Sequence, residues 1–205
     1  MDQETGRILV IGAGPCGLAV GAAARRAGVG CTLVDKGPIF RSIERYPIGM
    51  NFFSTADHLE VEDVPFGVAR DNPTRSEALK YYRRVVKHFD LDVRQYETVD
   101  SVERSNESFH VEARHLTGAS RSYRADAVVV ATGYFDTPNL LEVPGEDLPK
   151  VTHYVRDPHL YFDQDGLVVG GGNSAVETAL TPWRAGARVT MAHLFEGFDR
   201  GVKPW

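Results

Sequence analysis

GAGPCG at residues 12–17 separates an apolar run of strand length, residues 7–11, from an alanine-rich stretch with high helix propensity. Gly28 follows as a typical C-terminal stop for that helix, and a second apolar run at residues 31–34 ends in Asp35. The order of strand, glycine turn, helix, strand and acid predicts one complete βαβ unit.

The same pattern recurs later in the chain. A strand at residues 167–169 leads into GGGNSA at residues 170–175, followed by a helix and a strand at residues 188–192. In constant register the matched pairs are Gly12 with Gly170, Gly14 with Gly172, Gly17 with Ala175, Gly28 with Gly186 and Thr32 with Thr190. Two such copies predict two dinucleotide-binding loops, because a diphosphate needs helix N-terminal N–H groups and no side chain at the second glycine. The alternative for each loop is a glycine turn with a purely structural role.

The residues that end the second strand of each copy differ. Asp35 is predicted to accept hydrogen bonds from a ribose diol, with a solvated strand-end carboxylate as the alternative. The matching residue in the second copy is His193, which tolerates a 2′-phosphate, and Arg188, Arg200 and Lys203 add positive charge nearby. We therefore expect NADPH rather than NADH at the second loop; an ordinary exposed histidine is the alternative.

The sequence of the middle of the chain predicts loops, one helix and short strands. Residues 36–70 are irregular and aromatic, which favours a ligand-facing loop region. The capping-box pair Thr74 and Glu77 predicts a helix over residues 74–88, and residues 126–131, apolar after the initial Asp126, predict a continuous strand of the buried type. A small antiparallel meander is predicted from alternating segments at residues 92–96, 98–104, 108–115 and 121–125.

Composition excludes several classes of function. The chain of 205 residues has a formal net charge of −5, so it lacks the basic field that collects nucleic acid or anionic lipid. Its apolar runs are far shorter than the roughly 20 residues that span a bilayer. The polar, acidic start is unlike a signal peptide, and two cysteines form no disulfide framework, so we expect a cytoplasmic protein without a metal site.

Taken together, these features resemble the flavoproteins with two dinucleotide-binding domains. In that group the first copy holds FAD, a strand ending in Ala-Thr-Gly closes the FAD domain, and the second copy holds NADPH; residues 131–133 are Ala-Thr-Gly here. Within the group, the chain is most similar to the YpdA-type bacillithiol disulfide reductases, and the resemblance covers nearly its whole length. It rests on GPCG at 14–17, NFFS at 51–54, DVPF at 63–66, ATGY at 131–134, PGE at 144–146 and KPW at 203–205.

The resemblance implies an α/β fold with two Rossmann-like units. Residues 1–136 would form the FAD-binding domain with its small antiparallel meander, and residues 137–205 an inserted, partial NAD(P)-binding domain. Because members of the group continue beyond this point, the chain is expected to be truncated at its C-terminus and to bind FAD weakly or not at all by itself. Pro182 falls inside the second helix and is predicted to kink or shorten it.

The resemblance also implies an activity and a set of site residues. The activity is hydride transfer from NADPH to FAD, followed by reduction of a low-molecular-weight thiol disulfide, and a homo-oligomer is among the expected partners. The alternatives are a flavin-dependent monooxygenase, suggested by His153-Tyr154 before the second glycine loop, and a non-catalytic nucleotide-binding fragment. The predicted cofactor-binding residues are Gly12, Gly14, Pro15, Cys16, Gly17, Asp35, Lys36, Asn51, Phe52, Thr132, Gly133, Gly170, Gly172, Asn173, Ser174 and His193.

The chain contains no C-x-x-C pair, so either Cys16 carries the thiol chemistry or the substrate disulfide is reduced directly at the flavin. Cys16 falls in the first helical turn, where the helix dipole favours a thiolate, and the equivalent cysteine is the proposed redox residue of the resembled family. The alternative is a small residue chosen only for packing. Cys31 lies in an apolar strand and is predicted to be a packing residue.

Overall fold

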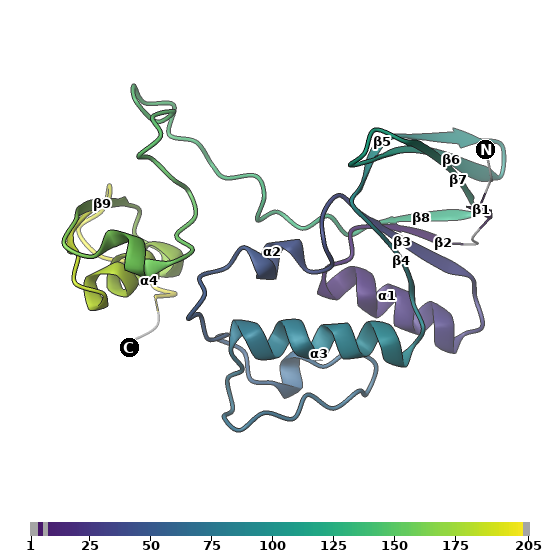
Figure 1. Cartoon of the computed structure of the whole chain (residues 1–205), viewed down its shortest axis with the longest axis horizontal. Coiled ribbons are helices and arrows are strands. Elements are labelled where there is room, and N and C mark those ends of the chain that lie inside the picture. Colours follow the sequence, from purple (N-terminus) through teal and green to yellow (C-terminus); the bar gives the residue numbers. More distant parts are fainter. Residues whose placement is uncertain (1–3, 6–7, 203–205) are drawn as a thin grey trace. The chain divides into compact units, whose positions relative to one another are not determined.

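The computed structural model describes residues 4–5 and 8–202 (Figure 1). The chain forms two compact units, one with the residues up to Tyr46 and Met50–Glu146, the other with Pro47–Gly49 and the residues from Asp147 onward. The domain boundary expected after residue 136 stays a prediction. Among the described helices, none is both long and apolar enough to cross a membrane.

A four-stranded parallel sheet forms the centre of the first unit. Its strand order is β4-β3-β2-β8. The strands are β2 (Ile8–Ile11), β3 (Cys31–Asp35), β4 (Asp92–Gln95) and β8 (Ala127–Val130). Helix α1 (Pro15–Arg26) connects β2 to β3, and Gly28 follows it with a φ of +67°, so the first βαβ unit is confirmed.

Helix α3 (Arg75–His88) starts where the capping box predicts. The Thr74 hydroxyl accepts a hydrogen bond from the Glu77 amide, and the Glu77 carboxylate accepts one from the Thr74 amide, so both partners satisfy free backbone donors. Between β3 and α3 the chain is mostly irregular, with only the short helix α2 (Arg41–Glu44) and the 3₁₀ turn η1 (Asp57–Leu59).

The two central strands of the parallel sheet, β2 and β3, are covered on both faces, which explains their continuous apolar sequences. Val10 and Leu33 pack against α1 and α3 on one face, whereas Leu9 and Val34 pack against an antiparallel layer on the other. Figure 1 shows the two helices and this antiparallel layer on opposite sides of β2 and β3.

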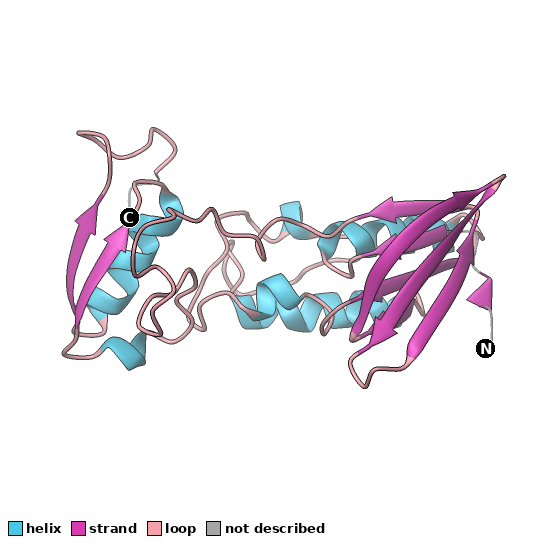
Figure 2. Cartoon of the chain, turned by 90° about the horizontal axis from the view of Figure 1, so that it is seen from above, coloured by secondary structure: helices cyan, strands magenta, loops and turns pink. Residues whose placement is uncertain are grey.

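The antiparallel layer differs in part from the predicted meander. It consists of β5 (Glu97–Ser105), β6 (Ser108–His115) and β7 (Ser120–Ala125), the long twisted strands of Figure 2, with β1 (Glu4–Thr5) parallel to β7. The assignment of residues 92–96 to the meander is wrong, since β4 pairs in parallel with β3. An alternating pattern of apolar residues indicates a strand that is buried on one face, but it does not indicate which sheet that strand joins.

Strand β8 is also less buried than its apolar sequence suggests. It forms within the predicted range, but Val130 is 70% exposed. The prediction of a buried strand is wrong because β8 occupies an edge of the sheet, where β2 is its one hydrogen-bonded neighbour among the described strands.

The second unit contains the second βαβ pattern. Strands β9 (Asp165–Val169) and β10 (Arg188–Ala192) pair in parallel and are connected by α4 (Asn173–Arg184); the turn η2 (Pro158–Tyr161) precedes them. Pro182 lies in the last turn of α4. The expected shortening is wrong, because α4 has 12 residues, as α1 does. Pro182 lacks the N–H that would donate to the carbonyl four residues earlier, but the helix continues for two residues beyond it.

Candidate functional site

The first glycine loop owes its shape to close backbone contacts. A Cβ atom on Gly12 would lie 2.3 Å from the Ala131 carbonyl oxygen, and one on Gly17 only 2.0 Å from the Gly12 carbonyl oxygen. Gly12 has a φ of +111°, a conformation that side chains disfavour. A Cβ on Gly14, in contrast, would meet nothing within 4 Å. Two glycines therefore build the turn, and the third leaves open space beside it.

That open space adjoins the N-terminus of α1. Gly14 is the N-cap residue, Pro15 begins the helix, no side chain caps it, and its first turn contains no acid. The backbone N–H groups of the first turn are thus left without a side-chain acceptor, and the helix dipole adds partial positive charge. A diphosphate fits these groups, which satisfies the requirement of a bound FAD at this loop.

Asp35 has a structural contact that the sequence did not predict. Its Oδ2 accepts a hydrogen bond of 2.8 Å from the Ala13 amide, and its Oδ1 accepts one of 2.9 Å from the Gly37 amide. The carboxylate therefore fixes the glycine loop to the end of β3. Because each carboxylate oxygen has a second lone pair, the ribose role of Asp35 stays a prediction compatible with these bonds.

The Ala-Thr-Gly segment lies against the same loop. The Ala131 amide donates a 2.8 Å hydrogen bond to the Ile11 carbonyl, and the exposed residues Thr132 and Gly133 follow. Asn51 and Phe52 are fixed elsewhere in the first unit, beside the start of α3. Asn51 pairs with Thr74, and the Phe52 amide donates to the Pro73 carbonyl.

A charged cluster beside the loop escaped the sequence analysis. The Asp136 carboxylate lies 2.9 Å from Lys36 Nζ, 2.8 Å from an Arg45 guanidinium nitrogen and 3.7 Å from Arg41 Nε. Burial works against ionisation, but the hydrogen bond and charge of Lys36, with Arg45 and Arg41, hold the pKa of Asp136 below its usual value. The four-residue spacing of the two arginines was a local signal, whereas Asp136 is distant in sequence.

Replacement of this carboxylate should be costly near neutral pH. Asp136→Asn is expected to lower the free energy of unfolding by about 2 kcal/mol at pH 7, because three cations lose their shared counter-charge. Since the folded pKa is depressed, this stabilisation is present above about pH 4 and is lost as the pH falls through the folded value. Urea unfolding at a series of pH values measures the difference.

Asp71→Asn is the matched control, because Asp71 is exposed and its carboxylate has no polar partner within the described part of the chain. It should change stability little at any pH. An equal loss in both variants, or a loss in Asp136→Asn that persists in acid, would contradict the assigned role.

The two cysteines lie in different environments. Cys16 is exposed in the first turn of α1, whereas Cys31 is half-buried at the start of β3. Burial, with a smaller contribution from Asp92, raises the pKa of the Cys31 thiol. Behind Cys16 lies the buried phenol of Tyr82, whose pKa is raised to about 12 by burial, then by Tyr81 and by Cys16. Cys16 is therefore the accessible thiol.

The second glycine loop repeats the backbone geometry of the first. Gly170 has a φ of +138°, Gly172 is the N-cap of α4, no side chain caps that helix, and Ser174 is exposed in its first turn. The other predicted residues contact the chain itself. Asn173 Nδ2 donates a 2.7 Å hydrogen bond to the Gly201 carbonyl, and a Cβ on Gly171 would lie 2.8 Å from His193 Nδ1.

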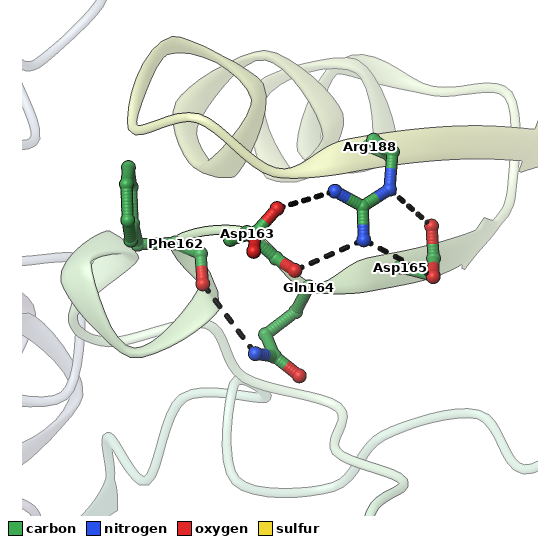
Figure 3. Close-up of polar contacts among 5 residues, drawn as sticks. All are labelled: Phe162, Asp163, Gln164, Asp165 and Arg188. Carbon is green, nitrogen blue, oxygen red and sulfur yellow. Dashed lines mark hydrogen bonds and ion pairs between the residues drawn. The ribbon is translucent and has the colours of Figure 1, made fainter.

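Arg188 does not serve the second loop. Its guanidinium binds Asp165 at 2.7 Å and Asp163 at 2.6 Å, as Figure 3 shows, and these two carboxylates raise its pKa. Arg188 begins β10, whereas the glycine loop lies beyond the carboxyl ends of the parallel strands. Its predicted contribution at a 2′-phosphate is therefore wrong. Arg200 is exposed, and Lys203 lies outside the described residues.

Comparison with known proteins extends these observations. Over 206 aligned residues the chain is 40% identical to the bacilliredoxin reductase Bdr of Bacillus subtilis strain 168, covering 100% of this chain and 61% of that protein. The structure of the bacillithiol disulfide reductase Bdr (YpdA) from Bacillus cereus matches with a TM-score of 0.96 and 40% identity, over 98% of this chain and 62% of that one. Its counterpart from Staphylococcus aureus gives 0.94 and 40%, over 99% and 61%.

These relatives confirm the predicted resemblance and the two-unit Rossmann-like fold, although the chain spans only about 61% of the length of the curated relative. The family model described as pyridine nucleotide-disulphide oxidoreductase matches residues 9–203. With both glycine loops inside that range, the chain belongs to the pyridine nucleotide-disulphide oxidoreductase family.

Proposed function

We propose that the chain binds FAD at its first glycine loop, weakly when it is by itself, and NADPH at its second, and that it acts in the reduction of a low-molecular-weight thiol disulfide of the bacillithiol type. The observation that carries the proposal is the pair of uncapped helix N-termini, each behind a glycine loop. The names of the relatives at 40% identity, a bacilliredoxin reductase and two bacillithiol disulfide reductases, support the substrate class.

In this proposal residues 1–136 bind FAD and residues 137–205 bind NADPH. At the first loop, the first-turn N–H groups beside Gly14 hold the diphosphate and Asp35 accepts from the ribose, while Lys36, which pairs with Asp136, follows Asp35 at the cofactor. The remaining predicted contacts with FAD come from Asn51, Phe52, Thr132 and Gly133. FAD bound there would supply the two-electron redox chemistry that connects NADPH to the disulfide.

The Cys16 thiolate is proposed to attack one sulfur of the substrate disulfide. The new bond forms a mixed disulfide, the substrate S–S bond breaks, and the first thiol leaves after taking up a proton. The electron pair from NADPH then reduces the mixed disulfide and releases the second thiol. In total, one NADPH and one proton convert one disulfide to two thiols. The cytoplasm, a reducing compartment, suits an exposed free thiol of this kind.

The test measures NADPH oxidation by the chain supplied with FAD and with a bacillithiol-type disulfide. We expect disulfide-dependent oxidation that falls to background in Cys16→Ser and persists in Cys31→Ser, the matched control at the half-buried thiol. Mass spectrometry should detect the mixed disulfide on Cys16 when the substrate is added without NADPH.

The other outcomes separate the alternatives. Full turnover by Cys16→Ser would remove the role of that thiol but keep the enzyme. Oxidation that depends on oxygen and ignores the disulfide would favour a monooxygenase. No oxidation with both cofactors bound would favour a non-catalytic nucleotide-binding fragment.

A further inference from the structure

The residues after β10 fold back onto the second glycine loop. We name residues 193–202 the covering segment. The Asp199 amide donates a 3.1 Å hydrogen bond to the Gly171 carbonyl, and the Gly201 carbonyl accepts the bond from Asn173. The ring of His193 stacks on Phe198, with centroids 5.6 Å apart and planes 17° apart. Two hydrogen bonds thus hold the segment to the loop, one of them from Asn173, which is predicted to bind a nucleotide, and the ring stack lies within the segment itself.

One side chain of the covering segment lies where a ligand is expected. A Cβ atom on Gly172 would be 3.1 Å from Asp199 Oδ2, whereas the corresponding position at Gly14 of the first loop meets nothing within 4 Å. The space that is open beside α1 is therefore occupied by a carboxylate beside α4. The two loops share a backbone design and differ in this respect.

Charge explains why a carboxylate is stable at this point. Helix α4 has neither a side-chain cap nor an acid in its first turn, so its N-terminal N–H groups and dipole attract a negative group. The exposed Asp199 carboxylate places a negative charge beside this N-terminus without hydrogen-bonding to it. A diphosphate needs the same N–H groups, and two anions in one place repel each other.

We infer that the covering segment is a displaceable lid on the NADPH site, in which the Asp199 carboxylate stands in for the nucleotide's diphosphate and must move away before NADPH binds. This inference rests on the proposed function of the second loop. NADPH then binds only the fraction of molecules in which the segment is open, so closure weakens the apparent affinity in proportion.

The test compares NADPH affinity, measured by calorimetry, for the full chain, Asp199→Asn and Glu196→Gln. Asp199→Asn keeps the backbone hydrogen bond to Gly171 and removes the charge, so we expect about tenfold tighter binding. Glu196→Gln removes the same charge from an exposed residue of the segment and should leave the affinity unchanged. Hydrogen exchange on the unsubstituted chain provides a second measurement: the Asp199 amide should exchange faster when NADPH is bound.

Each result decides the matter. Equal affinities for the chain and Asp199→Asn, with unchanged exchange at Asp199, would overturn the lid and leave the NADPH site in place. If Glu196→Gln raised the NADPH affinity as much as Asp199→Asn does, the change in net charge alone would explain the effect, and the lid would also be overturned. Failure of all three proteins to bind NADPH would overturn both the lid and the proposed role of the second loop.

Discussion

Gly17→Ala is expected to destabilise the first unit strongly. The added Cβ would lie 2.0 Å from the Gly12 carbonyl oxygen and 3.1 Å from its carbon, in a turn whose backbone is fixed on both sides by β2 and α1. Overpacking against movable side chains costs about 1–3 kcal/mol, and a backbone oxygen has less room to move, so we expect a loss above about 3 kcal/mol. Thermal unfolding followed by circular dichroism measures this loss.

Two further glycines of the same region calibrate the result. At Gly21 a Cβ would lie 2.9 Å from Leu33 Cδ1, the end of a flexible side chain, so Gly21→Ala should cost only about 1 kcal/mol. Gly14→Ala should leave stability unchanged, because its Cβ enters open space. Equal stabilities for all three variants would show that the contact between Gly17 and Gly12 does not control the fold.

Gly14→Val is expected to keep the fold and to abolish FAD binding. Gly14 has a φ of −81° and extended backbone, which any residue adopts, so the substitution introduces no strain. The valine side chain would occupy the open space through which the diphosphate approaches the N-terminus of α1. We expect at least about a hundredfold weaker FAD binding, equivalent to about 2.8 kcal/mol. Flavin fluorescence titration measures the affinity.

Gly67→Val is the matched control, since Gly67 also faces open space in the first unit and lies outside the glycine loop. It should bind FAD as the unsubstituted chain does. If Gly14→Val and Gly67→Val bind FAD equally well, the first loop is a structural turn and the FAD site lies elsewhere.

The local elements of the fold were predictable because their causes are local. The capping pair Thr74 and Glu77 marks the start of α3, and Gly28 marks the end of α1 by adopting a positive φ. The membership of β4 was not predictable in the same way. Its pairing with β3 depends on α3 returning the chain to the parallel sheet, and no residue pattern within 92–96 carries that information.

The site also has parts that the sequence predicts and parts that depend on the tertiary fold. The two glycine loops could be predicted because binding a diphosphate requires particular residues at fixed spacing. In the structure each loop leads into a helix that begins after its second glycine. Asp35 was found for its ribose role, but its bond to the Ala13 amide was not, because that bond joins the ends of two strands. The Asp136 cluster could not be predicted from the sequence, because it forms only when the fold places Asp136, which follows β8, close to Lys36 and Arg45.

The sequence by itself determined the two βαβ units, the positions of their glycine turns and the family, since these depend on propensity, spacing and backbone conformation. Only the tertiary structure decided which loop is open and which is covered. The atoms that lie beside Gly14 and beside Gly172 depend on how parts of the chain distant in sequence fold together. Asp199 is an example. Its carboxylate matters because it lies beside Gly172 at the N-terminus of α4, and the spacing of residues along the sequence does not predict that position.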